Sequence, residues 1–127
     1  MTTLAEDLFT VMAGNAQVQG IVGSRVYRTQ APQGVASPYV VWHGVSKRNI
    51  FDLDGSVVTG GLENPRLQVT SWSTKASDSD ALDRLVAAAM TGASQFKALE
   101  IDHRDLPYEP DTKLYGSQTD FSLWRSN

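Results

Sequence analysis

Residues 66–90 read RLQVTSWSTKASDSDALDRLVAAAM, and this stretch contains the two patterns that decide the fold. Over residues 66–73, Leu67 and Val69 alternate with polar and aromatic residues, which is the period of a β-strand with two unlike faces. The residues that follow repeat apolar side chains at the spacing of one helix face. These residues are Leu82, Leu85, Val86, Ala89 and Met90. The stretch therefore predicts a strand that leads directly into an amphipathic helix over residues 75–90.

The rest of the chain predicts more of both elements. Thr3 and Glu6 have the spacing of a capping box, which predicts a helix over residues 4–13 that ends at Gly14 and Asn15. A further short helical turn is predicted around Val18 to Val22. Strands are predicted over residues 26–29, 39–45, 96–103 and 116–125.

One strand detail and one connection complete the expected fold. Leu99 and Ile101 are expected on one face of their strand. Asp54-Gly55 is a favoured turn dipeptide, so residues 46–64 predict a protruding hairpin or long loop. The order of elements lacks a regular strand–helix–strand alternation. The expected fold is α+β, one domain over residues 1–127, with a mainly antiparallel sheet and two helices packed on one face.

Composition excludes several classes of function. The net charge is −3, which argues against specific binding of nucleic acid through phosphate contacts. The chain has no cysteine, which excludes disulfides and thiolate metal sites. The first residues lack the apolar run of a signal peptide, and no stretch has the length of a membrane span, so no membrane contact is expected.

Catalytic motifs are absent from the sequence. His43 and His103 are far apart, and no zinc-binding, nucleophile-elbow or phosphate-loop spacing occurs. We therefore predict no catalytic, cofactor-binding or metal-binding residue, no cofactor and no enzymatic activity. One alternative stays open, a small hydrolase that uses His103 with Asp102 or Asp105, although the charged run 102–105 is typical of a solvated strand end.

The three tryptophans each fall on a predicted strand. Trp42, Trp72 and Trp124 could form a base-stacking platform, but such platforms accompany a basic groove. In an acidic chain we expect these side chains to pack in the core or to contact another subunit.

Three ordered segments carry a family resemblance. Residues 21–42 contain IVGSRVY and then PYVVW, residues 66–73 read RLQVTSWS before the helix, and residues 106–115 read LPYEPDTKLY before FSLW at 121–124. With the N-terminal helix, this order resembles the tail-completion, or tail-terminator, family of long-tailed phages and prophages. The resemblance covers nearly the whole chain.

The resemblance implies a structural protein without catalytic residues. Such proteins assemble, typically as a hexameric ring, at the head-proximal end of the tail tube. There they stop polymerisation and form the surface that joins the capsid connector. The expected partners are other copies of the chain, the major tail-tube protein and the head–tail connector protein. The expected location is the host cytoplasm during assembly and then the virion tail.

The resemblance assigns no contact residues, so we chose candidates by exposure and segment length. The candidate interface comprises an arm and a turn, with the residues Lys47, Ile50, Phe51, Leu53, Val57, Val58, Leu62, Tyr108, Leu114 and Tyr115. Two further alternatives stay open. One is another head–tail joining or minor tail component, and the other is a monomeric acidic adaptor that binds a protein partner.

Overall fold

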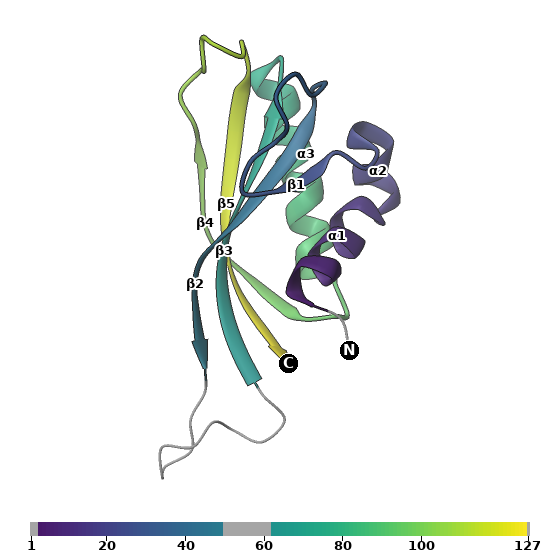
Figure 1. Cartoon of the computed structure of the whole chain (residues 1–127), viewed down its shortest axis with the longest axis vertical. Helices are drawn as coiled ribbons and strands as arrows, with labels where there is room; N and C mark the ends of the chain where they lie inside the picture. Colours follow the sequence, from purple (N-terminus) through teal and green to yellow (C-terminus); the bar gives the residue numbers. More distant parts are fainter. Residues whose placement is uncertain (1–2, 50–61, 127) are drawn as a thin grey trace.

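A twisted five-stranded sheet forms one layer of the protein, and three helices pack on one of its faces (Figure 1). The computed structural model describes residues 3–49 and 62–126. Its elements are α1 (Leu4–Ala13), α2 (Ala16–Val22), β1 (Val26–Arg28), β2 (Tyr39–Asn49), β3 (Leu62–Ser73), α3 (Ala76–Thr91), β4 (Lys97–Asp105) and β5 (Tyr115–Ser126). The α+β class expected from the sequence is confirmed, with one helix more than expected.

The strands lie in the order β1-β2-β3-β5-β4. β1 runs parallel to β2, and the other neighbouring pairs are antiparallel. β2 and β3 pair from Tyr39↔Trp72 to Asn49↔Glu63, so both strands are longer than their sequence patterns predicted. The predicted turn at Asp54-Gly55 lies outside the described residues. β5, the last strand in the sequence, lies between β3 and β4 inside the sheet.

Side-chain caps start the first two helices. The Thr3 hydroxyl accepts a hydrogen bond from the Glu6 amide at 3.1 Å, and the Glu6 carboxylate accepts one from the Thr3 amide, which confirms the predicted capping box. Asn15 was predicted to help end α1, but it begins α2. Its side-chain oxygen accepts hydrogen bonds from the amides of Gln17 and Val18 at 3.0 and 3.2 Å. This cap makes the expected helical turn a full helix.

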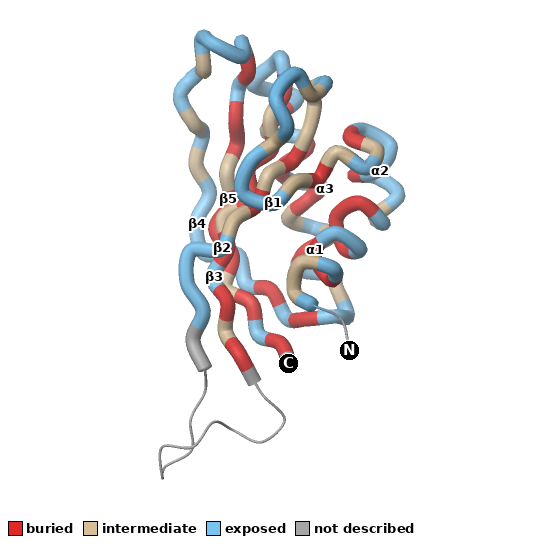
Figure 2. Tube along the Cα trace, viewed as in Figure 1, coloured by how far each residue is buried: buried red, intermediate tan, exposed pale blue. Residues whose placement is uncertain are grey.

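The core lies between the helices and one face of the sheet, where buried residues gather in Figure 2. Leu82, Val86 and Met90 of α3 are buried as their spacing predicted, and Phe121 and Leu123 of β5 lie in the same cluster. Among the residues that the structure describes, no helix has both the length and the apolar character needed to span a membrane.

β4 turns its long apolar side chains away from this core. Phe96 and Ala98 are buried, whereas Leu99 and Ile101 are 48% and 47% exposed. The register of β4 on β5 shifts between Glu100 and Asp102, so Ile101 is the extra residue of a β-bulge. The apolar pair that the sequence places on this strand therefore marks an exposed surface.

A buried ion pair joins the two ends of the chain. Arg125 Nη2 lies 2.7 Å from Asp7 Oδ2 of α1, and Arg125 Nη1 lies 3.0 Å from Glu63 Oε1 of β3. Lys47 Nζ lies 3.2 Å from the other Glu63 oxygen. Burial raises the pKa of Glu63, but the hydrogen bonds from Arg125 and Lys47 outweigh it and hold the pKa below its ordinary value. The network fixes α1 against the lower end of the sheet.

We expect Arg125→Met to lower the free energy of unfolding by about 3–5 kcal/mol, because it leaves the buried carboxylates of Asp7 and Glu63 without their shared cation. Lys47→Met is the matched control. Its side chain is 54% exposed, so its loss should cost about 1 kcal/mol or less. Urea unfolding measures both variants, and equal losses would contradict a dominant role for Arg125.

We also expect Gly116→Ala to cost about 1–3 kcal/mol of folding free energy, because the added methyl group is overpacked. A Cβ at Gly116 would lie 2.9 Å from Trp72 Cζ3 and 3.1 Å from Leu106 Cδ1. Gly44→Ala is the control, since a Cβ there meets nothing within 4 Å. Thermal and urea unfolding of the two variants should differ, and similar stabilities would show that Trp72 can move aside.

Candidate functional site

Within the described ranges, the sheet has two long open edges. β1 pairs only with Val40–Trp42 of β2, so the part of β2 from His43 onward has no strand on that side. β4 has β5 on one side and no strand on the other. Both edges are largely exposed in Figure 2. Unpaired backbone groups along such edges are able to pair with another chain.

Each open edge contains a β-bulge. The register of β2 on β3 shifts between Gly44 and Ser46, which makes Val45 the extra residue, and Val45 is 50% exposed. In β4 the extra residue of the bulge is Ile101. A bulge interrupts the regular ladder, so the regular parts of the two edges next to the bulges are residues 46–49 and 97–100.

No described helix packs on the second face of the sheet, which we call the uncovered face. This face is apolar near β4. Ser46, Arg66, Ser122 and Leu99 are direct neighbours in successive strands and form one row across the sheet. Leu99 ends this row at the β4 edge, and the partly exposed Trp124 is its diagonal neighbour on β5. The face therefore offers apolar surface at one edge of the sheet.

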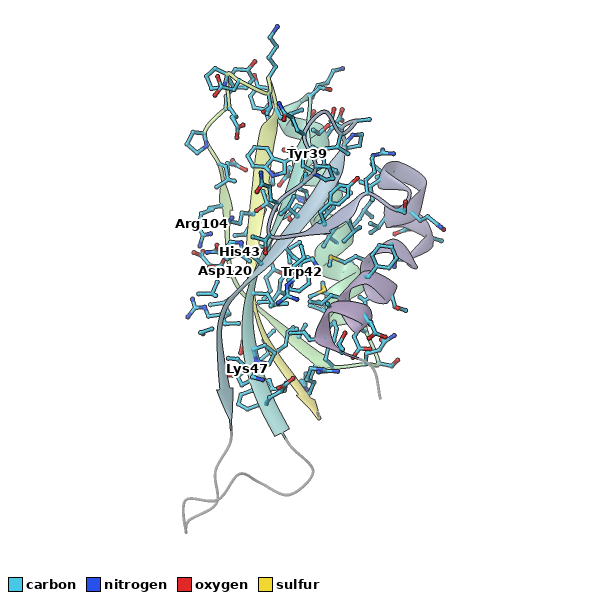
Figure 3. The ribbon with its side chains drawn as sticks, in the orientation of Figure 1. Tyr39, Trp42, His43, Lys47, Arg104 and Asp120 are labelled. Atoms are coloured by element: carbon cyan, nitrogen blue, oxygen red, sulfur yellow. The ribbon has the colours of Figure 1, made fainter. Side chains whose placement is uncertain are left out.

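Further along the same face, Arg104 is the centre of a polar network (Figure 3). Its guanidinium donates to both carboxylate oxygens of Asp120, at 3.2 and 2.8 Å, and to Asp102 at 2.9 Å. It also donates to Gln118, whose amide in turn donates to Thr70 at 2.9 Å. The hydrogen bonds from Arg104 to Asp120 and Asp102 raise its pKa above the ordinary value. This network joins β3, β5 and β4.

The His103 side chain lies on the helix-covered face, where it connects β4 to α3. Its Nδ1 lies 2.9 Å from Asp83 Oδ2 and 3.0 Å from Thr119 Oγ1, and its Nε2 lies 3.4 Å from Asp80 Oδ1. Asp83 is 1% exposed and also accepts hydrogen bonds from Ser71 at 3.3 Å and Thr119 at 2.5 Å. Burial raises the pKa of Asp83 to about 6, although the hydrogen bonds and His103 act in the other direction.

One group of side chains could supply metal ligands within the described ranges. A ring nitrogen of His103 and carboxylate oxygens of Asp80 and Asp105 lie within 4.8 Å of one another. Asp80 already has a cationic partner in Arg84 at 3.2 Å, and His103 is held by Asp83. These ion pairs account for the positions of Asp80 and His103.

A cleft of about 690 Å³ lies at the upper end of the uncovered face. It is lined by residues 29–35 and Ser37, by strand residues that include Tyr39, His43 and Trp72, and by Leu106, Glu109, Thr112 and Leu114. Burial, and then the charge of Glu109, raise the pKa of Tyr39. The cleft places aromatic and polar groups together.

The structure places the candidate interface residues in different settings. The Tyr108 and Tyr115 rings pack with centroids 4.8 Å apart, and both side chains are partly exposed. Leu114 is buried beneath the turn, where its carbonyl accepts a hydrogen bond from the Glu109 amide at 3.0 Å. Lys47 is exposed near the β2 edge. Leu62 is described only as the first residue of β3, and Ile50, Phe51, Leu53, Val57 and Val58 lie outside the described residues.

The sequence model of the Tail completion protein gp17 family matches residues 6–126. The chain belongs to this family. It is therefore a structural component of phage-type tails, as the resemblance of its ordered segments implied. No curated protein sequence matches the chain.

The fold of this tail completion protein is similar to that of a chain in the virion of a native gene transfer agent (GTA) particle. The TM-score is 0.74 at 15% sequence identity, and the match covers 98% of this chain and 95% of that chain. At this identity the similarity shows a shared fold.

Of the two hydrolase pairs suggested by the sequence, His103 with Asp102 does not form, whereas an Asp105 carboxylate oxygen lies within 4.8 Å of a His103 ring nitrogen. Asp102 lies on the uncovered face with Arg104, and its carboxylate accepts a hydrogen bond from the His103 backbone amide at 2.9 Å. The contacts of the His103 ring at ion-pair distance are with Asp83 and Asp80 of α3. The pairing of His103 with Asp83 was not expected from the sequence, where its one available signal was Asp83, a charged residue on the apolar face of a predicted helix.

The tryptophans also fail to form a common platform. Trp42 is buried on the helix-covered face, and Arg28 Cζ lies 5.2 Å from the centroid of its ring. Trp72 and Trp124 lie on the uncovered face. Core packing explains Trp42, and packing against Gly116 explains Trp72.

Asp83 should make the stability of this tail completion protein depend on pH. The folded form holds the Asp83 proton more tightly than the unfolded chain does. The contribution of this proton to the free energy of unfolding is therefore fully present below about pH 4 and is lost as the pH rises through about 6. A shift of about two units corresponds to about 3 kcal/mol.

We expect Asp83→Asn, which keeps the shape and removes the charge, to abolish this contribution. Urea unfolding of both proteins between about pH 4 and about pH 7 measures it as the difference between two curves. As the pH rises, the free energy of unfolding of the unaltered protein should fall relative to that of Asp83→Asn. Parallel curves would contradict the raised pKa.

Proposed function

We propose that this tail completion protein caps the head-proximal end of the tail tube, stops polymerisation of the tube and forms the surface that joins the capsid connector. The observation that supports this function is the family match over residues 6–126. The similarity to a chain of a GTA virion is consistent with a place in an assembled particle.

The mechanism is geometric. Several copies, six as the resemblance implies, form a ring on the last ring of the major tail-tube protein. One side of the ring contacts the tube, and the other side contacts the head–tail connector protein. Because the two open edges of the sheet are unlike, contacts between copies can be head-to-tail, and such contacts form a ring when the rotation closes. A ring whose two sides differ does not repeat along the tail axis, so growth of the tube stops.

The charge of the chain fits a passage for DNA. With a net charge of −3, a ring of this protein attracts phosphate weakly, so DNA moving through the lumen is not retained. The protein acts in the host cytoplasm during assembly and then remains in the virion tail.

Deleting the gene in a particle-producing strain tests the function. We expect tubes of uncontrolled, greater length and heads without joined tails, because nothing ends tube growth or supplies the joining surface. Electron microscopy of lysates measures tube length and the fraction of joined particles. The control is the same strain complemented with the unaltered gene.

Two other outcomes separate the alternatives. Tubes of normal length that do not join heads would indicate a head–tail joining protein that does not terminate the tube. Normal particles would contradict both roles.

A further inference from the structure

The strand directions of the sheet favour one way of placing two copies side by side. β2 is antiparallel to β3, β3 to β5, and β5 to β4, so β2 and β4 run in opposite directions at the two sides of the sheet. A second copy in the same orientation would bring its β2 next to β4 of the first copy as an antiparallel neighbour. The alternation of strand directions then continues across the boundary.

From this arrangement we infer that neighbouring copies in the ring join by strand pairing, with residues 97–100 of β4 in one copy beside residues 46–49 of β2 in the next. The inference rests on the proposed ring and names the contact that holds it together. The sheet of each copy then continues into the sheet of its neighbour.

The bulges define which parts of the edges pair. Val45 ends the regular edge of β2 on one side, and Ile101 ends that of β4. Beyond Ile101, the His103 amide already donates to the Asp102 carboxylate at 2.9 Å. The stretches 46–49 and 97–100 are therefore the regular edge segments adjoining the two bulges.

The row across the sheet fixes the register between unlike edges. Ser46 and Leu99 are the two ends of one row across the sheet, so continuing the sheet places Leu99 of one copy next to Ser46 of the next. In this antiparallel register the exposed Lys47 is a diagonal neighbour of Glu100, and Lys97 stands opposite Arg48. The contact therefore rests on the strand directions and on the continued row rather than on charge.

Two β2 edges side by side would bring together segments that both contain Lys47 and Arg48 and no acidic residue. Like charges on facing strands are destabilising, which disfavours a two-fold contact through β2.

Crosslinking tests this contact directly, because the chain has no cysteine and every introduced thiol is unique. Ser46→Cys and Leu99→Cys replace exposed side chains at the two ends of the row. The variants are produced together with the tail-tube protein of the same particle, so that rings form where the protein acts. A short, flexible bis-maleimide then joins thiols that lie close together.

We expect a mixture of the Ser46→Cys and Leu99→Cys proteins to form crosslinked dimers, and each variant alone to stay uncrosslinked. A chain with both substitutions should give a ladder of products that ends at the full ring. Phe9→Cys, exposed on α1, is the matched control and should not crosslink to Leu99→Cys.

Three results would overturn the inference. They are rings that form without crosslinks in the mixture, crosslinks of Ser46→Cys with itself, and crosslinks of Phe9→Cys that equal those of Ser46→Cys. Native mass spectrometry of the same samples separates two kinds of failure. If only the inferred strand contact is wrong, rings are still present; if the proposed function is wrong, no oligomer forms on tube ends.

Discussion

The structure depends on one constraint, which is that three helices cover a single face of a five-stranded sheet. Apolar side chains from α1, α2 and α3 and from alternate strand positions bury one another on that side, and this supplies most of the hydrophobic stabilisation. On the other face no helix packs within residues 3–49 and 62–126, and its positions carry the Arg104 network, the aromatic cleft and the exposed side chains of β4. A protein built in this way keeps a whole sheet face and two sheet edges available for contacts with other chains.

Buried polar contacts fix how the elements sit on this core. Asp83 holds His103 across the junction of α3 and β4, and Arg125 joins β5 to both α1 and β3. Such pairs add less net stability than an equally well-packed apolar cluster, but removing one partner is costly. They therefore define a single position for each outer element. This matters for the edge strand β4, which within the described residues pairs with β5 on one side and with no strand on the other.

The sequence was most informative where structure is local. The alternation at 66–73, the helical stripe of α3 and the capping box at Thr3 each depend on neighbouring residues, and each was predicted correctly. Asn15 was misassigned because an asparagine between two helices suits the end of one and the start of the next. The pairing of His103 with Asp83, the ion pair of Arg125 with Asp7 and the row from Ser46 to Leu99 all join distant segments. No local period encodes which strands become neighbours, so these contacts, and the open edges they leave, required the structure.

The position of β5 has a consequence for how the protein is made. Residues 115–126 come late in the sequence, yet they fill the gap between β3 and β4, and Arg125 then closes onto Asp7 near the start. A chain that leaves the ribosome from its N-terminus cannot complete this sheet until its final strand emerges. Incomplete products therefore lack the paired framework that positions both edges. A product that stops before residue 115 lacks β5, so β4 has no partner strand and the contact of Arg125 with Asp7 cannot form.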